Sequence, residues 1–385
     1  MSKLRILVSG MVAGVPYQGG ATWAALQYVL GFKRLGHDVY FLEPLTPRTL
    51  CPPDAPLAQT ANASYFNDVM RAFGLEQNSA LLLTSTRETV GLPYGHLRQI
   101  AGRADVVANL SGTLKDAELL DSIPIRVFLD LDPGFNQLWH EVGGIDMGFA
   151  AHTHFVTVGL SLGRPECDVP TCGRHWFPTL QPIVLSYWPV AHAITYDALT
   201  SIGNWRAYGS IEHQGIFYGQ KAHSLRRLLT LPKISRESFC LALSIHPDER
   251  SDLQALKRNG WNLLDPAKVA ATPDLYQEFI RGSKAELGVA KSGYVVSRAG
   301  WFSDRSVCYL ASGRPVIAQE TGFSRFLPTG KGLLGFQTAE EAVGAIEAIN
   351  KDYRQHASAS RAIAEDHFDS DKVLSGLLCH LGVAA

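Results

Sequence analysis

The chain has 385 residues, with 35 lysines and arginines against 36 aspartates and glutamates. This length exceeds what one hydrophobic core usually supports, so we predict two domains. The near-neutral charge excludes a global electrostatic attraction to nucleic acid or to an anionic membrane. We therefore expect a small-molecule or glycan partner and no nucleic acid.

Apolar runs and cysteines indicate the compartment. No uncharged apolar run reaches the ~18 residues that a membrane-spanning helix needs, so we expect no transmembrane segment. The short apolar run at 6–8 is broken by Ser9-Gly10 and lacks the cleavage site of a signal peptide. Six cysteines scattered over the chain do not form a disulfide framework. We predict a cytoplasmic protein.

The first half of the sequence alternates strand and helix patterns, which requires a parallel sheet with helices on its faces. Between 155 and 189, prolines and tryptophans oppose regular helix, so we interpret this segment as one strand with long loops leading to a linker. The predicted elements are a strand over 4–9, a helix over 21–35, and strands over 38–42, 105–110 and 125–131.

A second α/β block begins near residue 198, and the whole chain therefore reads as two doubly wound, Rossmann-like domains. Its predicted strands cover 239–243, 261–264, 294–297 and 316–318, and its predicted helices cover 223–229, 275–284, 304–311, 339–350, 353–364 and 371–381.

The segment 299–322 has the features of an anion site. Ser303 is a good N-cap residue between the glycine turn 299–302 and the helix over 304–311. Free backbone N–H groups and the positive end of that helix would face the turn, where a phosphate can bind. The next strand ends at a second turn, where ligands of open α/β sheets bind. The candidate ligand-binding residues are Gly300, Trp301, Ser303, Asp304, Arg305, Ser306, Glu320, Thr321 and Gly322.

This segment resembles the donor-binding half of GT-B nucleotide-sugar glycosyltransferases, in particular the bacterial group 1 glycosyl transferases. The shared pattern is ASGRPVI at 311–317, TG at 321–322 and PTGKGLL at 328–334. The resemblance covers the chain from about residue 201 to its end, and more weakly the opening strand and glycine turn. Several fixed glycines make it far more specific than a lone GxGxxG.

The resemblance implies a GT-B fold with an acceptor-binding domain at 1–195 and a donor-binding domain at 196–365. Residues 366–385 would form a helix that packs back on the first domain. It also implies transfer of a sugar from a nucleoside-diphosphate sugar, with UDP- or dTDP-sugars favoured as donor and no cofactor required. The alternatives are a GT-B sugar-nucleotide epimerase or hydrolase, and a glycosyltransferase-like binding protein without turnover.

One position departs from that pattern. Many retaining members carry a glutamate five residues before Gly313, where it hydrogen-bonds the nucleotide ribose, and this chain has Cys308 there. Asp304 or Glu320 would then supply the carboxylate. Asp304 is equally well explained by compensation of the helix dipole. Because its charge would repel a phosphate, we expect Arg305 to restore the balance.

The loop 10–20 follows the first strand and precedes a helix, as in a nucleotide site. The resemblance places Gly19 and Gly20 against the donor phosphates, where a missing side chain lets the backbone approach. A tight turn alone would also explain these glycines. The loop lacks GxGxxG spacing, but Glu43 ends the second strand and could serve a dinucleotide ribose, so an NAD-dependent dehydrogenase stays an alternative.

Basic residues near the start of the second domain are candidates for the donor pyrophosphate. The resemblance places Arg206 and Lys221 there, although solvated surface charge explains them too. Lys331 lies in a TGKG run, but no serine or threonine follows it, which excludes a phosphate-loop ATPase. The sequence has no Asp-x-Asp pair in a donor context, and we predict a metal-independent enzyme.

Two candidate catalytic residues belong to the first domain. Asp132 closes a predicted strand together with Asp130, and a carboxylate at the cleft could act as general base. The Asp-Pro-Gly run is also a plain turn signal. His154 is our second candidate base, because its ordinary pKa is ~6.5. A zinc site could be drawn from His152, His154, Cys167, Cys172 and His175, but their spacing does not favour it.

Overall fold

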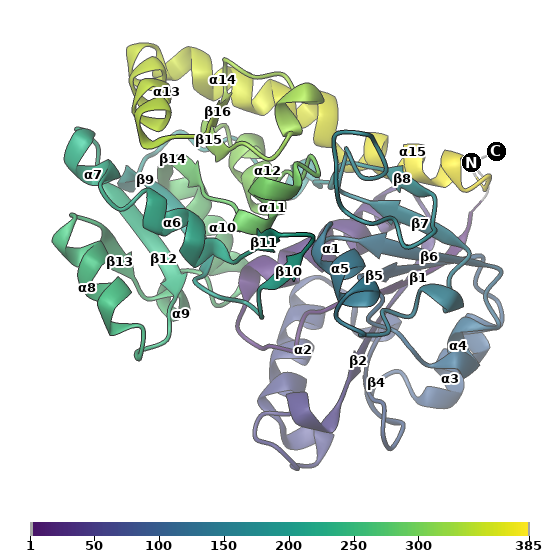
Figure 1. Cartoon of the computed structure of the whole chain (residues 1–385). Coiled ribbons are helices and arrows are strands. Elements are labelled where there is room, and N and C mark those ends of the chain that lie inside the picture. The colour runs from purple at the N-terminus through teal and green to yellow at the C-terminus, as the bar shows by residue number, and fades with distance from the viewer. Residues whose placement is uncertain (1–2, 384–385) are drawn as a thin grey trace.

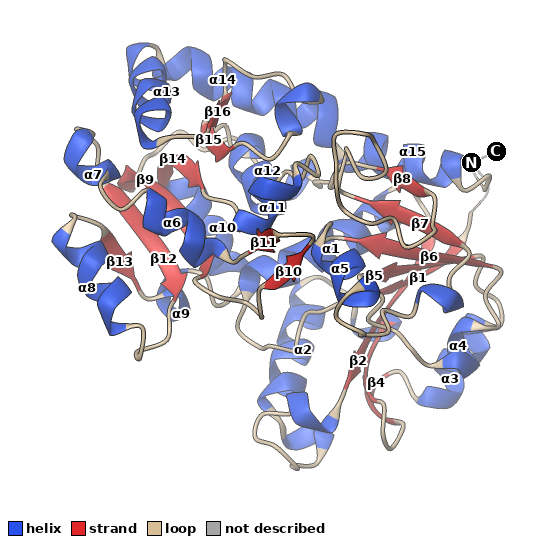
Figure 2. Cartoon of the chain, in the orientation of Figure 1, coloured by secondary structure: helices blue, strands red, loops and turns tan. Residues whose placement is uncertain are grey.

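The computed structural model describes residues 3–383 and contains two mainly parallel sheets with helices on their faces (Figures 1 and 2). In spatial order, the eight strands of the first sheet are β4 (Glu88–Gly91), β3 (Ser79–Leu83), β2 (Asp38–Leu45), β1 (Arg5–Ser9), β5 (Val106–Leu110), β6 (Ile125–Asp130), β7 (His154–Thr157) and β8 (Trp176–Pro178). Its helices are α1 (Gly19–Arg34), α2 (Ala61–Ala72), α3 (Tyr94–Ala101), α4 (Ala117–Leu120) and α5 (Phe135–Glu141).

The six strands of the second sheet are, in spatial order, β13 (Asn262–Leu264), β12 (Phe239–Ser244), β9 (Tyr196–Asn204), β14 (Ser283–Gly288), β15 (Val316–Gln319) and β16 (Leu333–Phe336). A separate hairpin contains β10 (Ile211–His213) and β11 (Ile216–Tyr218). The helices of this half are α6 (Lys221–Arg227), α7 (Leu231–Ile234), α8 (Arg250–Arg258), α9 (Pro266–Val269), α10 (Pro273–Gly282), α11 (Ser292–Ser297), α12 (Asp304–Ala311), α13 (Ala339–Lys351), α14 (Tyr353–Ile363) and α15 (Ser370–His380).

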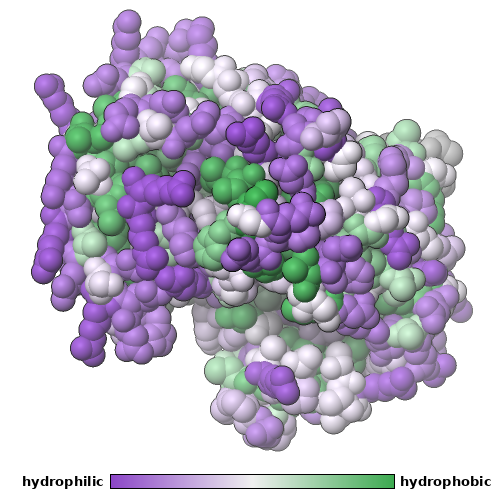
Figure 3. All heavy atoms as spheres, in the orientation of Figure 1, coloured by the Kyte–Doolittle hydropathy of each residue, from purple (hydrophilic) through white to green (hydrophobic). Residues whose placement is uncertain are grey.

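The predicted doubly wound α/β architecture is confirmed. Within each of the two large sheets, neighbouring strands run parallel except β3 and β4. Central strands such as β3 and β5 are buried at every position, as expected for parallel strands covered on both faces. Hydrophilic side chains dominate the edge of the molecule over α7 and α8, and apolar ones gather near the centre of the same face (Figure 3).

The strand predicted over 294–297 is wrong, because these residues form the short helix α11. The strand that completes the second sheet is β14, which the sequence analysis assigned partly to a helix. The charged residues of β14 make the strand look exposed in the sequence, although it is buried. Glu286 is fully buried and pairs with Arg305 at 2.6 Å, and Lys284 pairs with Glu237 at 2.9 Å.

The chain ends against the first domain, where α15 packs along α1 (Figure 1). Leu374 lies directly against Gly31, and Arg34 forms an ion pair with Asp371 at 2.9 Å. The fully buried Leu374 and Leu378 anchor the helix. The last helix therefore joins the core of the half in which the chain begins.

Within residues 3–383, no helix is long and apolar enough to cross a membrane. The same residues contain no cluster of three His, Cys, Asp or Glu side chains that could hold a metal ion. In the zinc arrangement considered above, His152 is already engaged through both ring nitrogens, by Asn109 at 2.9 Å and by the Gly148 carbonyl at 2.8 Å. All six cysteines are free thiols.

Candidate functional site

A cleft pocket of about 380 Å³ lies where the two sheets face each other. The strand order of the second sheet reverses between β9 and β14, and that of the first between β1 and β5. Ligands of open α/β sheets bind at such switch points, outside the carboxyl ends of the strands. The pocket is lined by the loop after β1, by the ends of β9 and β12, and by the starts of α9 and α12.

Glycines keep two walls of this region bare. A Cβ atom on Gly20 would lie 2.8 Å from the ring of Tyr276, and one on Gly203 would lie 2.9 Å from Lys221 Nζ. Any side chain at either position would push into a neighbour. Gly19 has a different role, because its N–H donates to the Ala270 carbonyl at 2.9 Å and so ties the two domains together. Of the two predicted glycines, only Gly20 lines the pocket.

Lys221 is a largely buried lysine whose amino group has no hydrogen-bond or ion-pair partner within residues 3–383. Its side chain begins α6 and the residue is 8% exposed. Burial lowers the pKa of Lys221 well below its ordinary value, the charge of Arg305 lowers it further, and Glu286 opposes both. A buried charge is costly unless it is paired. An anionic ligand beside Gly203 would supply the missing counter-charge.

Arg305 already has partners inside the protein. Its Nε donates to Glu286 at 2.6 Å and its Nη1 donates to the Ile202 carbonyl at 3.0 Å. The expectation that Arg305 balances a phosphate against Asp304 therefore needs correction, because Glu286 neutralises this guanidinium first. Arg305 still lines the cleft pocket. Its contacts fix the start of α12 to β9 and β14.

The start of α12 carries a half-buried carboxyl group, Asp304. Asp304 lines both the cleft pocket and a smaller cavity of about 100 Å³ that Cys308 also lines. Asp304 and Cys308 are one turn apart on α12 and so share a face. Burial raises the pKa of Asp304, and the charge of Arg305 opposes the shift. Ser303 occupies the N-cap position without a capping hydrogen bond, and Ser306 is buried.

The predicted phosphate turn at 299–302 is packed against protein. The Gly300 N–H donates to the Thr321 carbonyl at 2.8 Å, and a Cβ on Gly300 would lie 3.1 Å from Leu160. Trp301 stacks on Tyr294 with ring centroids 4.1 Å apart, and its carbonyl accepts a hydrogen bond from Thr321. The structure thus places Gly300, Trp301 and Thr321 in contacts between segments, and none of the three lines the cleft pocket.

Two further candidates lie elsewhere. Glu320 and Gly322 line a separate polar hollow of about 670 Å³ at the ends of β15 and β16. Glu320 accepts a hydrogen bond from the Gly322 N–H at 2.6 Å, so one oxygen shapes its own turn. Arg206 forms an ion pair with Glu249 at 2.5 Å. Between the two possible ribose carboxylates, only Asp304 faces the cleft pocket.

The two candidate bases, His154 and Asp132, lie at opposite strand ends of the first sheet. His154 begins β7 and pairs with Val127 in the sheet, whereas the carboxyl ends of the same strands are Asp130 and Thr157. His154 lies near His380 of the last helix. Asp132, by contrast, follows the carboxyl end of β6 and pairs with Lys291 of the second domain at 3.1 Å. The structure therefore brings Asp132 to the cleft and leaves His154 at the opposite edge.

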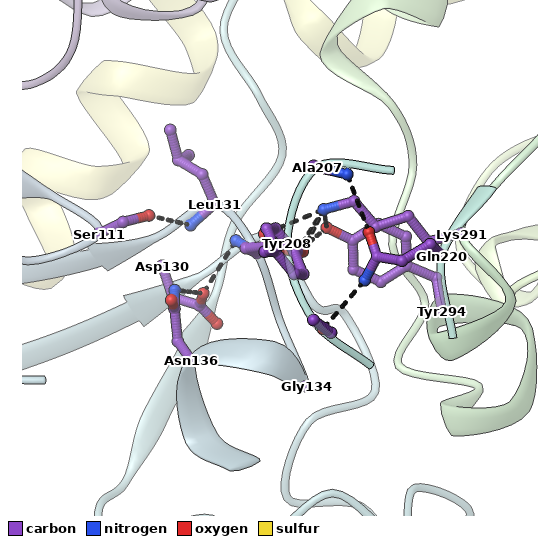
Figure 4. A network of polar contacts seen from close by, with 12 residues as sticks. Ser111, Asp130, Leu131, Gly134, Asn136, Ala207, Tyr208, Gln220, Lys291 and Tyr294 are labelled. Carbon is purple, nitrogen blue, oxygen red and sulfur yellow. Dashed lines mark hydrogen bonds and ion pairs between the residues drawn. The ribbon is translucent and has the colours of Figure 1, made fainter. Parts of the chain in front are cut away.

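Asp132 is the centre of a polar cluster that the sequence analysis missed. Lys291 lies 3.1 Å from Asp132 Oδ2, and the hydroxyl groups of Tyr208 and Tyr294 donate to the two carboxylate oxygens. Figure 4 shows these three side chains converging on the loop that follows Asp130. The signal available in the sequence was weak, because Lys291 is 159 residues from Asp132.

Asp130 and Glu43 are buried carboxyl groups that shape the cleft loops. Asp130 accepts hydrogen bonds from Asn136 at 2.6 Å, Gln137 at 2.9 Å and Thr157 at 2.8 Å. Burial nevertheless raises its pKa to about 6. Glu43 accepts from backbone N–H groups of the loop after β1, and burial raises its pKa to about 7. Each carboxyl group holds one of the loops that border the cleft.

No model of a known protein family matches the sequence, and no curated protein matches it. Solved structures share the fold. An alpha-glucosyltransferase in complex with UDP has a TM-score of 0.62 at 12% identity, covering 99% of this chain and 100% of that one. Anabaena HepE in complex with UDP and glucose has a TM-score of 0.59 at 11% identity, covering 98% and 99%. The chain has the GT-B fold seen in glycosyltransferases, and the predicted fold class is confirmed.

The expectation of no nucleic acid partner is wrong as an inference from charge. An alpha-glucosyltransferase in complex with UDP and a 13-mer DNA containing a central A:G mismatch matches at a TM-score of 0.62 and 13% identity. A related structure contains UDP-glucose and DNA with an abasic site. Proteins of this fold therefore include DNA binders, and the net charge of a whole chain does not exclude a local contact with nucleic acid.

Proposed function

We propose that this chain transfers a sugar from a UDP-sugar to a hydroxyl group of an acceptor, without a metal ion. The observation that carries the proposal is the unpaired amino group of the largely buried Lys221, which lies against Gly203 at the wall of the cleft pocket. UDP in the neighbours' complexes supports this nucleotide, with dTDP as the next candidate.

In the proposed reaction, the main task of the protein is to stabilise UDP as the leaving group. The acceptor oxygen bonds to the anomeric carbon while the bond from that carbon to the diphosphate oxygen breaks, UDP leaves with the electron pair, and the acceptor's proton passes to the departing phosphate oxygen. Lys221 and the N–H groups at the start of α12 would neutralise the growing negative charge. In this proposal the bare backbone at Gly20 admits the phosphates, and Asp304 accepts hydrogen bonds from the ribose.

Turnover assays separate this proposal from its alternatives. Release of UDP from UDP-glucose and other UDP-sugars is measured with and without a panel of acceptors. Release that depends on an acceptor supports transfer, and release without one indicates a hydrolase. Conversion of the sugar without release indicates an epimerase. UDP binding with no conversion of any sugar would favour a binding protein and overturn the transferase.

The variants Lys221→Met and Lys233→Met provide a matched pair. Lys233 is exposed on α7 and belongs to the same domain. Because loss of one preorganised donor costs about 10²-fold in turnover, we expect Lys221→Met to lower kcat/KM by that order. Lys233→Met should behave as wild type. Equal activity of both variants would remove Lys221 from the site.

A further inference from the structure

Asp132 belongs to the first domain, but its side chain is held by the second. Lys291 Nζ lies 3.1 Å from one carboxylate oxygen and 3.3 Å from the other, and Tyr208 and Tyr294 each donate a phenolic hydrogen bond to it. All three donors come from loops or helix starts beside the switch point of the second sheet. With every oxygen of Asp132 engaged, this carboxylate is built into a contact between domains.

Aromatic rings from both domains surround the ammonium of Lys291. It is 4.0 Å from the ring centroid of Tyr208 and 5.1 Å from those of Phe135 and Tyr294. Phe135 begins α5 of the first domain, just after Asp132. The side chains of Lys291 and Asp132 are only 19% and 20% exposed. A buried ion pair contributes little net stability, and its best-attested role is to fix one geometry.

The same cluster reaches the proposed donor site through packed side chains. Tyr294 stacks on Trp301, which precedes the start of α12, and Trp301 bridges to Gly159 of the first domain. Tyr208 precedes the β10–β11 hairpin in the connection between β9 and α6, and α6 begins with Lys221. Both segments that flank the switch point are therefore fixed by contacts to Asp132.

We propose that Asp132 is a positioning residue, the first-domain half of a latch that holds the cleft closed through Lys291, Tyr208 and Tyr294. In this role it carries no proton during turnover. It fixes the two segments that present Lys221 and Asp304, so that the anion site is assembled only while the domains are together. This role deepens the proposed function. Only the experiment with added UDP rests on the proposed function, and the experiment without ligand does not.

The first test measures the shape of the protein without ligand. Small-angle X-ray scattering compares wild type with Asp132→Asn, and with Asp121→Asn as a control for an exposed first-domain carboxylate. A compact chain of this length has a radius of gyration of ~21 Å, and we expect Asp132→Asn to exceed wild type by on the order of 1 Å. Asp121→Asn should match wild type. An unchanged radius in a folded Asp132→Asn protein would overturn the latch.

The second test measures the radius of gyration in the presence of saturating UDP. A residue with a purely structural role would not make this radius depend on UDP. A ligand that binds the closed state better shifts the population toward it. UDP should therefore shrink Asp132→Asn back toward the wild-type radius and leave wild type unchanged. If wild type fails to bind UDP, the proposed donor is wrong, but the comparison without ligand still decides the latch.

Tyr208→Phe is a milder variant that tests the same cluster if Asp132→Asn does not fold. It retains the ring and the ion pair and removes one phenolic hydrogen bond. The latch predicts a partial expansion and at least a threefold fall in UDP-sugar turnover for this variant. A general-base role of Asp132 predicts wild-type shape and turnover for Tyr208→Phe, with a loss of transfer in Asp132→Asn at unchanged UDP affinity. That second pattern would overturn the positioning role.

Discussion

Two buried ionisable side chains, Lys221 and Glu43, have opposite surroundings. Among the described residues 3–383, Lys221 has no hydrogen-bond or ion-pair partner, whereas Glu43 accepts hydrogen bonds from the Ala13 N–H at 2.8 Å and the Gly14 N–H at 2.6 Å. Glu43 is 1% exposed. A side chain so occupied is not free to bind a ribose, which removes the acidic residue on which the dinucleotide alternative depends. The amino group of Lys221, in contrast, lacks a counter-charge, which an anionic ligand can supply.

Glu43 should make stability fall as pH rises. Burial raises its pKa from 4.5 to about 7, so between these values the folded state holds a proton that the unfolded state has lost. This contribution is fully present below pH 4.5 and is lost as pH rises through 7. Urea unfolding of wild type and Glu43→Gln at pH 5 and pH 8 should show their free-energy difference changing by about 2 kcal/mol. A constant difference would contradict the shifted pKa.

At the scale of elements, the contact between β14 and α12 positions the start of the proposed site. Glu286 from the strand and Arg305 from the helix form a buried pair at 2.6 Å. Removing one partner of such a pair leaves an uncompensated charge and costs about 3–5 kcal/mol. We expect Arg305→Met and Glu286→Gln each to lose stability of that order in urea unfolding. The double variant should lose less than the sum, and additive losses would show that the two residues act independently.

The same two elements show what a sequence can and cannot reveal. The pattern after Ser303 predicted α12 with its correct bounds, because capping and helix propensity are local properties. The pattern at 283–288 concealed β14, because the partners of Lys284 and Glu286 come from distant segments. The β-branched run at 294–297 suggested a strand that does not form. Local periodicity contains no information on ion pairs that close over long separations.

The candidate site divides in the same way. Asp304 was accessible from the helix start after Ser303, whereas Gly20 and Lys221 were candidates because of the family resemblance. Tyr208 and Lys291 were not candidates, since nothing local marks a tyrosine or a lysine as the partner of Asp132. The packing of Gly300 against Leu160 of the first domain was equally invisible. Contacts between domains are a property of the assembled chain.

At the scale of the whole molecule, the last helix closes the chain on its beginning. α15 packs on α1, the helix whose first turn carries Gly19 and Gly20 at the cleft. Leu374 is fully buried in this contact. We expect Leu374→Ala to destabilise the protein by about 2–5 kcal/mol, because the lost side chain leaves a cavity. Thermal unfolding beside the exposed-site control Lys372→Ala should show the loss, and equal melting temperatures would contradict this packing.

The most direct measurement is isothermal calorimetry of UDP binding to wild type, Lys221→Met and Lys233→Met, with NAD as the comparison ligand. If the buried ammonium receives the diphosphate, wild type and Lys233→Met bind UDP equally. Lys221→Met should then bind at least about tenfold more weakly, a loss of about 1.4 kcal/mol. NAD should not bind. Equal UDP affinity in all three proteins, or binding of NAD alone, would contradict a donor site at this cleft.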